Sequence, residues 1–149
     1  MINDDLKLRG DVAIVLKDKN GNVKESREIK NLVVTAGLTF ICSRMAGTSA
    51  DVMSHMALGS STTAASAGQT DLVSILGSRE ALDSSTPSAN TIAYVSSFEA
   101  GEGTGAVTEA GVFNAASSGT MLCRTVFPVV NKQADDTMSV TWTITLTAS

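Results

Sequence analysis

The chain has few charged side chains. Asp, Glu, Lys and Arg make up 17% of its 149 residues, whereas soluble domains usually contain about 25%. Eleven basic residues are scattered among fifteen acidic ones, and the formal net charge is -4. Because phosphate contact needs clustered Lys and Arg, we expect no direct binding of nucleic acid. A surface so poor in charge is typical of a protein that is partly covered by another protein.

Cysteines and long apolar runs are also scarce. The two cysteines, Cys42 and Cys123, are too few for the disulfide framework of a small secreted domain. Each lies within an apolar run, so we expect two buried free thiols. No apolar stretch approaches the ~18 residues that a membrane span needs, and the segment 1–5 lacks the basic and apolar regions of a signal peptide. We therefore expect synthesis in a cytoplasm and no contact with a membrane.

Residues suited to catalysis are few as well. His55 is the only histidine, and with two distant cysteines it offers neither a Ser-His-Asp arrangement nor a zinc site. The glycines between Gly101 and Gly105 precede strand-like residues instead of the helix that a nucleotide loop requires. Glu99, Glu102 and Glu109 could form a glycosidase-like pair, but aromatic residues, which line such clefts, make up only 4% of the chain. We expect no catalytic residue, no cofactor, no metal and no enzymatic activity.

Alternation of apolar and polar residues predicts most of the structure. Asn20-Gly21 between the apolar runs 12–16 and 23–29 predicts a β-hairpin, because both turn residues tolerate a positive φ. The segment from Met138 to Leu146 alternates without a break, which predicts a half-buried antiparallel strand. Further strands are expected at 52–58, 79–83, 91–98, 107–114 and 121–130, a turn of helix at 69–75, and loops at 60–68 and 84–88.

One segment shows helical periodicity instead. Leu38, Ile41, Cys42 and Met45 recur at the spacing of one helix face. They predict one helix, about Ala36–Met45, with Thr35 as its N-cap and Gly47 as its end. We expect its apolar face to be sealed against a sheet. About seven or eight short strands and one helix predict a mainly β fold, an antiparallel β-sandwich or jelly-roll-like single domain over residues 1–149.

An ordered set of segments from Asn31 to the C-terminus resembles small structural proteins of tailed bacteriophages. That group includes capsid cement (decoration) proteins and tail-fibre or collar modules. The segments are NLVVTAGL at 31–38, MALGSSTTA at 56–64, VTEAGVFN at 107–114, TVFPVVNK at 125–132 and VTWTI at 140–144. The resemblance implies that Glu109 satisfies neighbouring backbone or partner groups and that Gly111 permits close packing.

The resemblance also implies a function. We expect a non-enzymatic capsid cement protein that binds and stabilises the mature capsid lattice by mass action. Its partners would be the major capsid protein and copies of itself in a homotrimer, and it would lie on the capsid surface of the virion after synthesis in the host cytoplasm. The alternative is a tail, collar or fibre component involved in tail assembly or host attachment. A chain of this length has room for only one of the attachment segment, shaft and tip of a fibre, which favours cement.

Contacts with partners are expected at two places. Residues 1–10 are expected to form an N-terminal arm that reaches a neighbouring subunit. The candidate interface residues are Ile2, Leu6, Leu8, Glu109 and Phe113.

Overall fold

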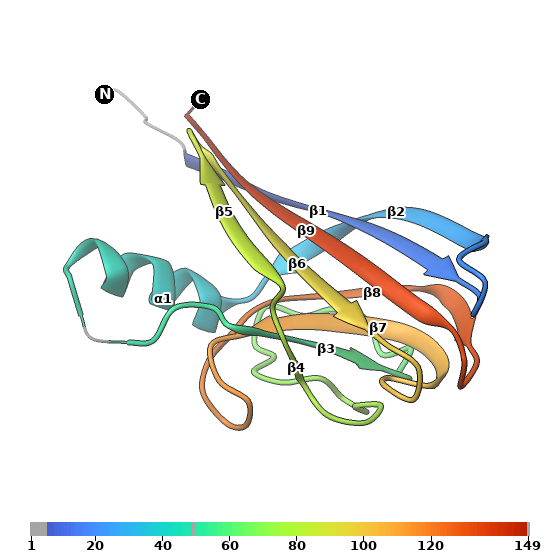
Figure 1. Ribbon diagram of the computed structural model, residues 1–149. Coiled ribbons are helices and arrows are strands. Elements are labelled where there is room, and N and C mark those ends of the chain that lie inside the picture. Colours follow the sequence, from blue (N-terminus) through green and yellow to red (C-terminus); the bar gives the residue numbers. More distant parts are fainter. Residues whose placement is uncertain (1–5, 49, 149) are drawn as a thin grey trace.

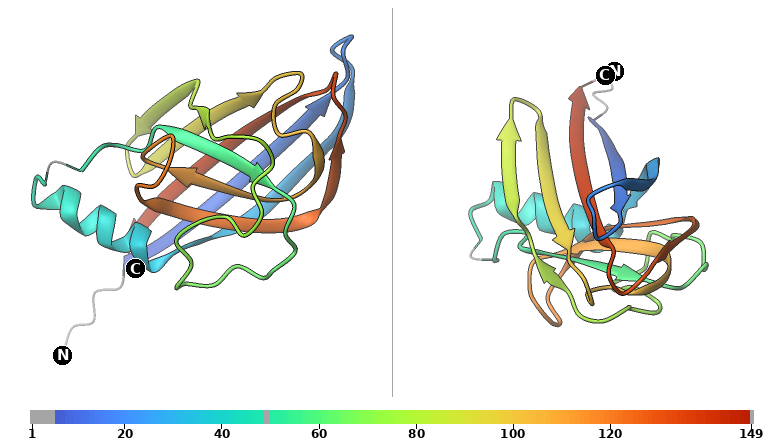
Figure 2. Two further views of the ribbon diagram at one scale, coloured as in Figure 1. Left: turned by 90° about the horizontal axis from the view of Figure 1, so that it is seen from below. Right: turned by 45° about the vertical axis from the view of Figure 1, so that its right-hand side comes forward.

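A curled antiparallel sheet forms two facing layers. The computed structural model describes residues 6–48 and 50–148, and over this range the sheet has nine strands in the order β4-β3-β7-β8-β2-β1-β9-β6-β5. One layer contains β5, β6, β9, β1 and most of β2, and the other contains β8, β7, β3 and β4 (Figures 1 and 2). The elements are β1 (Leu6–Lys17), β2 (Val23–Val33), α1 (Thr35–Met45), β3 (His55–Gly59), β4 (Glu80–Ala81), β5 (Ser84–Ser88), β6 (Thr91–Phe98), β7 (Gly105–Phe113), β8 (Met121–Lys132) and β9 (Thr137–Ala148). The prediction of a mainly β, sandwich-like domain with one helix is confirmed.

The core lies between the two layers. Along β9, Val140, Trp142 and Ile144 point inward with at most 2% of each residue exposed, while the hydroxyl residues between them lie on the outer face. This is the alternation that the sequence predicts for the last strand. The inward residues meet side chains from every long strand of both layers, among them Ile14, Phe98, Met56, Leu58, Val107 and Val130.

Two buried acidic groups within this core should make the fold sensitive to alkali. Burial raises the pKa of Tyr94 to about 12 and raises the pKa of the Cys123 thiol well above its ordinary value of 9.0. In the folded chain both groups keep their protons at pH values where the unfolded chain loses them. The free energy of unfolding is therefore expected to fall as the pH rises from about 9 towards 12.

Denaturation in urea at a series of pH values measures this dependence. Tyr94→Phe removes one of the two groups and should make the fall shallower between the ordinary pKa of tyrosine, 10.0, and about 12. An equally steep fall in this variant would contradict the assignment to Tyr94.

The β1–β2 hairpin forms as predicted, but only one of the two predicted turn residues has a positive φ. Asp18 Oδ1 accepts hydrogen bonds from the backbone N–H groups of Asn20 (2.8 Å) and Asn22 (3.0 Å). Gly21 has a φ of +82°, while Asn20 keeps a negative φ. The connection is thus a five-residue loop built on the Asp18 side chain, and only its glycine requires the left-handed conformation.

Two predicted segments differ from the structure. The predicted loop at 84–88 is the edge strand β5, which pairs with β6 from Ser84 opposite Val95 to Ser88 opposite Thr91. Pro87 is tolerated there because a strand at the edge of a sheet does not need every N–H for pairing. The predicted turn of helix at 69–75 is irregular, because this segment is held by side chains of the sheet below it.

The helix forms where predicted, with a different cap. α1 begins at Thr35, but Val34 occupies the N-cap position and no side chain caps the helix. Gly47, with a φ of +72°, ends it as expected, and its N–H donates to the Arg44 carbonyl oxygen. The prediction of Thr35 as the N-cap was therefore wrong, because the N-cap lies one residue earlier.

The apolar face of α1 is not sealed. The helix meets β8 at its N-terminal end, where Gly37 lies against the backbone of Leu122, and it then extends beyond the sheet (Figure 1). Leu38 is 45% exposed, Met45 is 84% exposed, and Cys42 is exposed too. Of the predicted apolar face only Ile41 packs against the core, so the expectations of a fully sealed face and of a buried Cys42 were wrong, whereas Cys123 is buried as expected.

Strand β2 joins the two layers at one side of the sandwich. It pairs with β1 along most of its length, and with β8 only through Leu32 and Val33. Further along, Arg27 donates to the carbonyl oxygens of Pro128 (2.9 Å) and Val129 (3.2 Å). An ion pair of 2.7 Å joins Lys24 of β2 to Asp136, the residue before β9. Backbone pairing joins the layers only at Leu32 and Val33, and charged side chains join them along the rest of this side.

Candidate functional site

The long connection between β3 and β4, here called loop 60–79, covers the outer face of β7 and β8. Its returning half pairs with the end of β3, since Leu76 N–H donates to the Leu58 carbonyl and Ser60 N–H donates to the Ser74 carbonyl, both at 2.8 Å. The Thr108 hydroxyl of β7 donates to the Ser61 carbonyl at 2.8 Å. The Ser/Thr/Ala-rich segment is thus an ordered loop fastened to the sheet.

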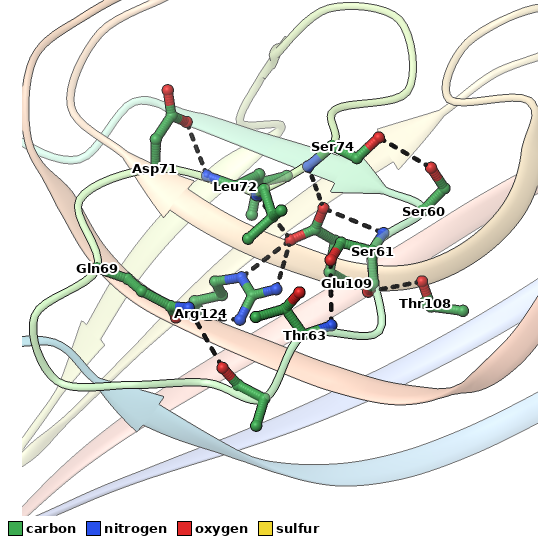
Figure 3. Close-up of polar contacts among 12 residues, drawn as sticks. Ser60, Ser61, Thr63, Gln69, Asp71, Leu72, Ser74, Thr108, Glu109 and Arg124 are labelled. Atoms are coloured by element: carbon green, nitrogen blue, oxygen red, sulfur yellow. Dashed lines mark hydrogen bonds and ion pairs between the residues drawn. The ribbon is translucent and has the colours of Figure 1, made fainter.

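A buried carboxylate at the centre of this face holds the loop (Figure 3). Glu109 of β7 is 0% exposed. Its Oε1 accepts hydrogen bonds from the backbone N–H groups of Ser74 (2.7 Å) and Ser61 (3.3 Å), and its Oε2 accepts one from Val73 (3.1 Å). One side chain therefore satisfies backbone donors from both halves of loop 60–79, as the resemblance implies for Glu109.

Arg124 of β8 neutralises this carboxylate. Its Nε and Nη2 lie 2.9 Å and 2.8 Å from Glu109 Oε2, and Arg124 is also 0% exposed. Its Nη1 donates to Gln69 Oε1 at 3.0 Å, which extends the network into the loop. Burial of two charges is costly unless they are paired and hydrogen-bonded. The pair is hydrogen-bonded through Arg124 Nε and Nη1, while Nη2 lies close to the carboxylate without a hydrogen bond.

Glycines leave room for the buried pair. Gly59 lies opposite Glu109 in the β3–β7 register, and a Cβ at Gly59 would lie 2.5 Å from Glu109 Oε1. Gly111 lies opposite Arg124 in the β7–β8 register, and a Cβ there would lie 3.0 Å from Leu72 Cδ2. Loop 60–79 can therefore approach the sheet closely, and the packing role expected of Gly111 is confirmed.

A second anchor lies at the end of the loop. The Arg79 guanidinium stacks 3.6 Å above the centre of the Phe113 ring. Its Nη1 donates to the carbonyl oxygens of Ala115 (2.9 Å) and Ser118 (2.7 Å) in the β7–β8 turn. Phe113 is 0% exposed and lies in a small apolar cluster with Val34, Ala57, Leu72 and Met121.

The predicted interface residues are not brought together. Glu109 and Phe113 lie beneath loop 60–79, so the prediction that they contact a partner was wrong for both. Leu6 is 70% exposed, whereas Leu8 is half-buried and packs against the core. Ile2 lies outside the described residues, as do residues 1–5 of the predicted arm, and residues 6–10 belong to β1 and pair with β9.

Arg124 and Arg79 were missed by the reasoning from sequence. The sequence did contain a signal for Arg124. Two neighbouring apolar strands carry residues of opposite charge in their interiors, Glu109 in β7 and Arg124 in β8. A charge within a run that reads as buried needs a partner, and adjacent strands are the nearest place to find one. Arg79 lies next to a loop and gave no comparable signal.

Large apolar side chains are exposed at several places on the described surface. Leu32, Leu38, Met45 and Val52 lie on α1 or in the segments beside it, Val73 and Ile75 lie on loop 60–79, Val23 and Val129 lie on β2 and β8, and Leu6 begins β1. Contiguous groups of such side chains are typical of surfaces that bind protein, whereas single ones are ordinary on any folded domain. Among the described residues, no group of three or more His, Cys, Asp or Glu side chains could hold a metal ion. Over the same range, no helix is both long enough and apolar enough to cross a bilayer.

Comparisons with protein-family models, curated proteins and solved structures found no match. The inference of function therefore depends on the surface and on the residues themselves.

Proposed function

We propose that this chain is a non-enzymatic structural protein of a tailed-bacteriophage virion, a capsid cement protein that binds the mature capsid lattice. The main support is that apolar side chains are exposed at several separate places on a surface with little charge. A lattice component contacts several neighbours at once, and therefore needs more than one such surface. The partners proposed are the major capsid protein and copies of this chain in a homotrimer on the capsid surface.

The anchored loop supports the same proposal. The buried Glu109–Arg124 pair holds loop 60–79 in one conformation, with the side chains of Val73 and Ile75 exposed on it. A surface that is ordered before binding loses less conformational entropy on binding. If such a surface binds the mature lattice and not its precursor, each bound copy stabilises the mature state by mass action.

The number of copies in purified virions tests the proposal. Quantitative mass spectrometry against the major capsid protein should find this chain nearly stoichiometric with the coat. Addition of purified chain to particles that lack it should then raise the temperature at which the capsids release their DNA. A few copies for each particle would instead indicate the tail, collar or fibre role, and complete absence from the virion would overturn the proposal.

A further inference from the structure

The tip of the β1–β2 hairpin contains the only Asn-Gly pair of the chain, Asn20-Gly21. Both residues are exposed, and a Cβ at Gly21 would meet no atom within 4 Å. Asparagine is thermolabile in proteins, because the backbone nitrogen of the next residue can attack its side-chain amide. Every other asparagine of this chain is followed by a residue whose side chain hinders that attack. Asn20 is therefore the asparagine most open to the reaction.

The reaction is a loss of ammonia followed by an addition of water. The Gly21 nitrogen gives up its proton and forms a bond to Asn20 Cγ, and the side-chain NH2 leaves with a proton as ammonia. Water then opens the resulting cyclic imide at one of its two carbonyl carbons. One opening leaves an ordinary aspartate at position 20, and the other leaves isoaspartate, whose backbone runs through Cβ and Cγ. Nothing is oxidised or reduced, and water is the only co-reactant.

The structure holds the attacking nitrogen in a closed turn. Gly21 N–H donates to the Asp18 carbonyl oxygen at 3.0 Å. Asp18 Oδ1 accepts the N–H groups of Asn20 (2.8 Å) and Asn22 (3.0 Å) on either side of it. A nitrogen whose proton is held in a hydrogen bond loses that proton less readily, so the attack requires the turn to open. Opening of an exposed turn costs far less free energy than global unfolding.

The two products differ in how they fit this turn. Asp18 N–H donates to the Asn22 carbonyl oxygen at 2.9 Å and so closes the loop across its base. An aspartate at position 20 keeps the length of the backbone between these two residues, whereas isoaspartate lengthens it by one atom. Both products add a carboxylate two residues from Asp18, where like charges repel. Isoaspartate is therefore expected to loosen the tip of the hairpin more than aspartate does.

We propose that Asn20 is a site of spontaneous deamidation in this chain, and that the turn built on Asp18 controls the rate. Each conversion adds one negative charge to a chain whose formal net charge is -4, so the protein becomes a mixture of charge forms as it ages. The inference concerns the chain itself and does not depend on the proposed function.

Incubation of the purified folded chain in mildly alkaline buffer provides the first test. Peptide mapping by mass spectrometry should find aspartate and isoaspartate at position 20, with Asn22 unchanged in the same peptide. The rate should rise with pH, because the Gly21 nitrogen must lose its proton. The chain unfolded in urea should convert faster, because no turn holds that proton. Conversion of Asn22 as fast as Asn20, or an unconverted Asn20 in the folded chain after the unfolded chain has converted completely, would overturn the proposal.

Two variants of Asp18 provide the second test. Asp18→Ala removes the acceptor of two backbone N–H groups, so the turn should open more often and Asn20 should convert about fivefold faster. Asp18→Asn keeps an acceptor oxygen in the same place, and as the matched control it should convert at nearly the rate of the unchanged chain. Circular dichroism should show both variants folded, since the turn lies on the surface. An Asp18→Ala protein that converts no faster than Asp18→Asn would contradict control by the turn.

Discussion

Replacement of Glu109 by alanine should lower the free energy of unfolding by about 3–5 kcal/mol. The Arg124 guanidinium, 0% exposed, would remain buried without its counter-charge. Three backbone N–H groups of loop 60–79, on Ser61, Val73 and Ser74, would also lose their acceptor. Denaturation in urea measures the stability, and limited proteolysis should detect earlier cleavage within loop 60–79.

Two further variants separate the causes. Glu28→Ala removes an exposed carboxylate from β2 and should change stability by no more than about 0.5 kcal/mol. Glu109→Gln combined with Arg124→Met removes both charges at similar volume, and should be more stable than Glu109→Ala because no unpaired charge remains buried. If Glu109→Ala were as stable as Glu28→Ala, the carboxylate would not be the anchor of the loop.

Gly37→Ala should destabilise the chain by about 1–3 kcal/mol, although alanine is the better helix former. The added Cβ would lie 2.1 Å from the carbonyl oxygen of Leu122, and 2.8 Å and 2.9 Å from that residue's C and Cα atoms. These are backbone atoms of β8, so α1 or the strand would have to move. In an exposed helix the same change would instead stabilise by about 1 kcal/mol.

Gly68→Ala is the matched control for this steric argument. A Cβ at Gly68 meets no atom within 4 Å, and its φ lies outside the left-handed region. The change should therefore be neutral or slightly stabilising. Thermal unfolding of both variants measures the contrast, and a Gly37→Ala protein at least as stable as the unchanged chain would show that α1 can lift from β8 at little cost.

Local sequence patterns predicted the strands whose apolar and polar residues alternate regularly along their length. β9 alternates because one face meets the core and the other does not, and the β1–β2 hairpin follows from Asn-Gly between two apolar runs. Strand β5 could not be found in this way. Ser84–Ser88 has the composition of a loop and contains Pro87, and it is a strand only because β6 offers it a partner.

The helix and the buried ion pair show what local patterns leave open. Helical spacing located α1 but did not show which of its sides packs against the sheet. The side that contains Leu38 was predicted to be covered, but it is exposed. The approach of Gly37 to Leu122 decides that side, and it depends on the position of β8. Glu109 and Arg124 are fifteen residues apart and meet only through the β7–β8 register. A third component of the site, loop 60–79, has no periodicity that could place it.

The margins of the sheet affect how the protein behaves at high concentration. The terminal strand β5 contains a proline, the opposite terminal strand β4 has two residues, and Arg27 caps the β8 carbonyl groups where β2 diverges. Short strands, prolines and charged side chains at sheet margins hinder the edge-to-edge pairing that starts cross-β aggregation. At high concentration the chain is therefore hindered from pairing edge to edge and growing into amyloid-like fibrils.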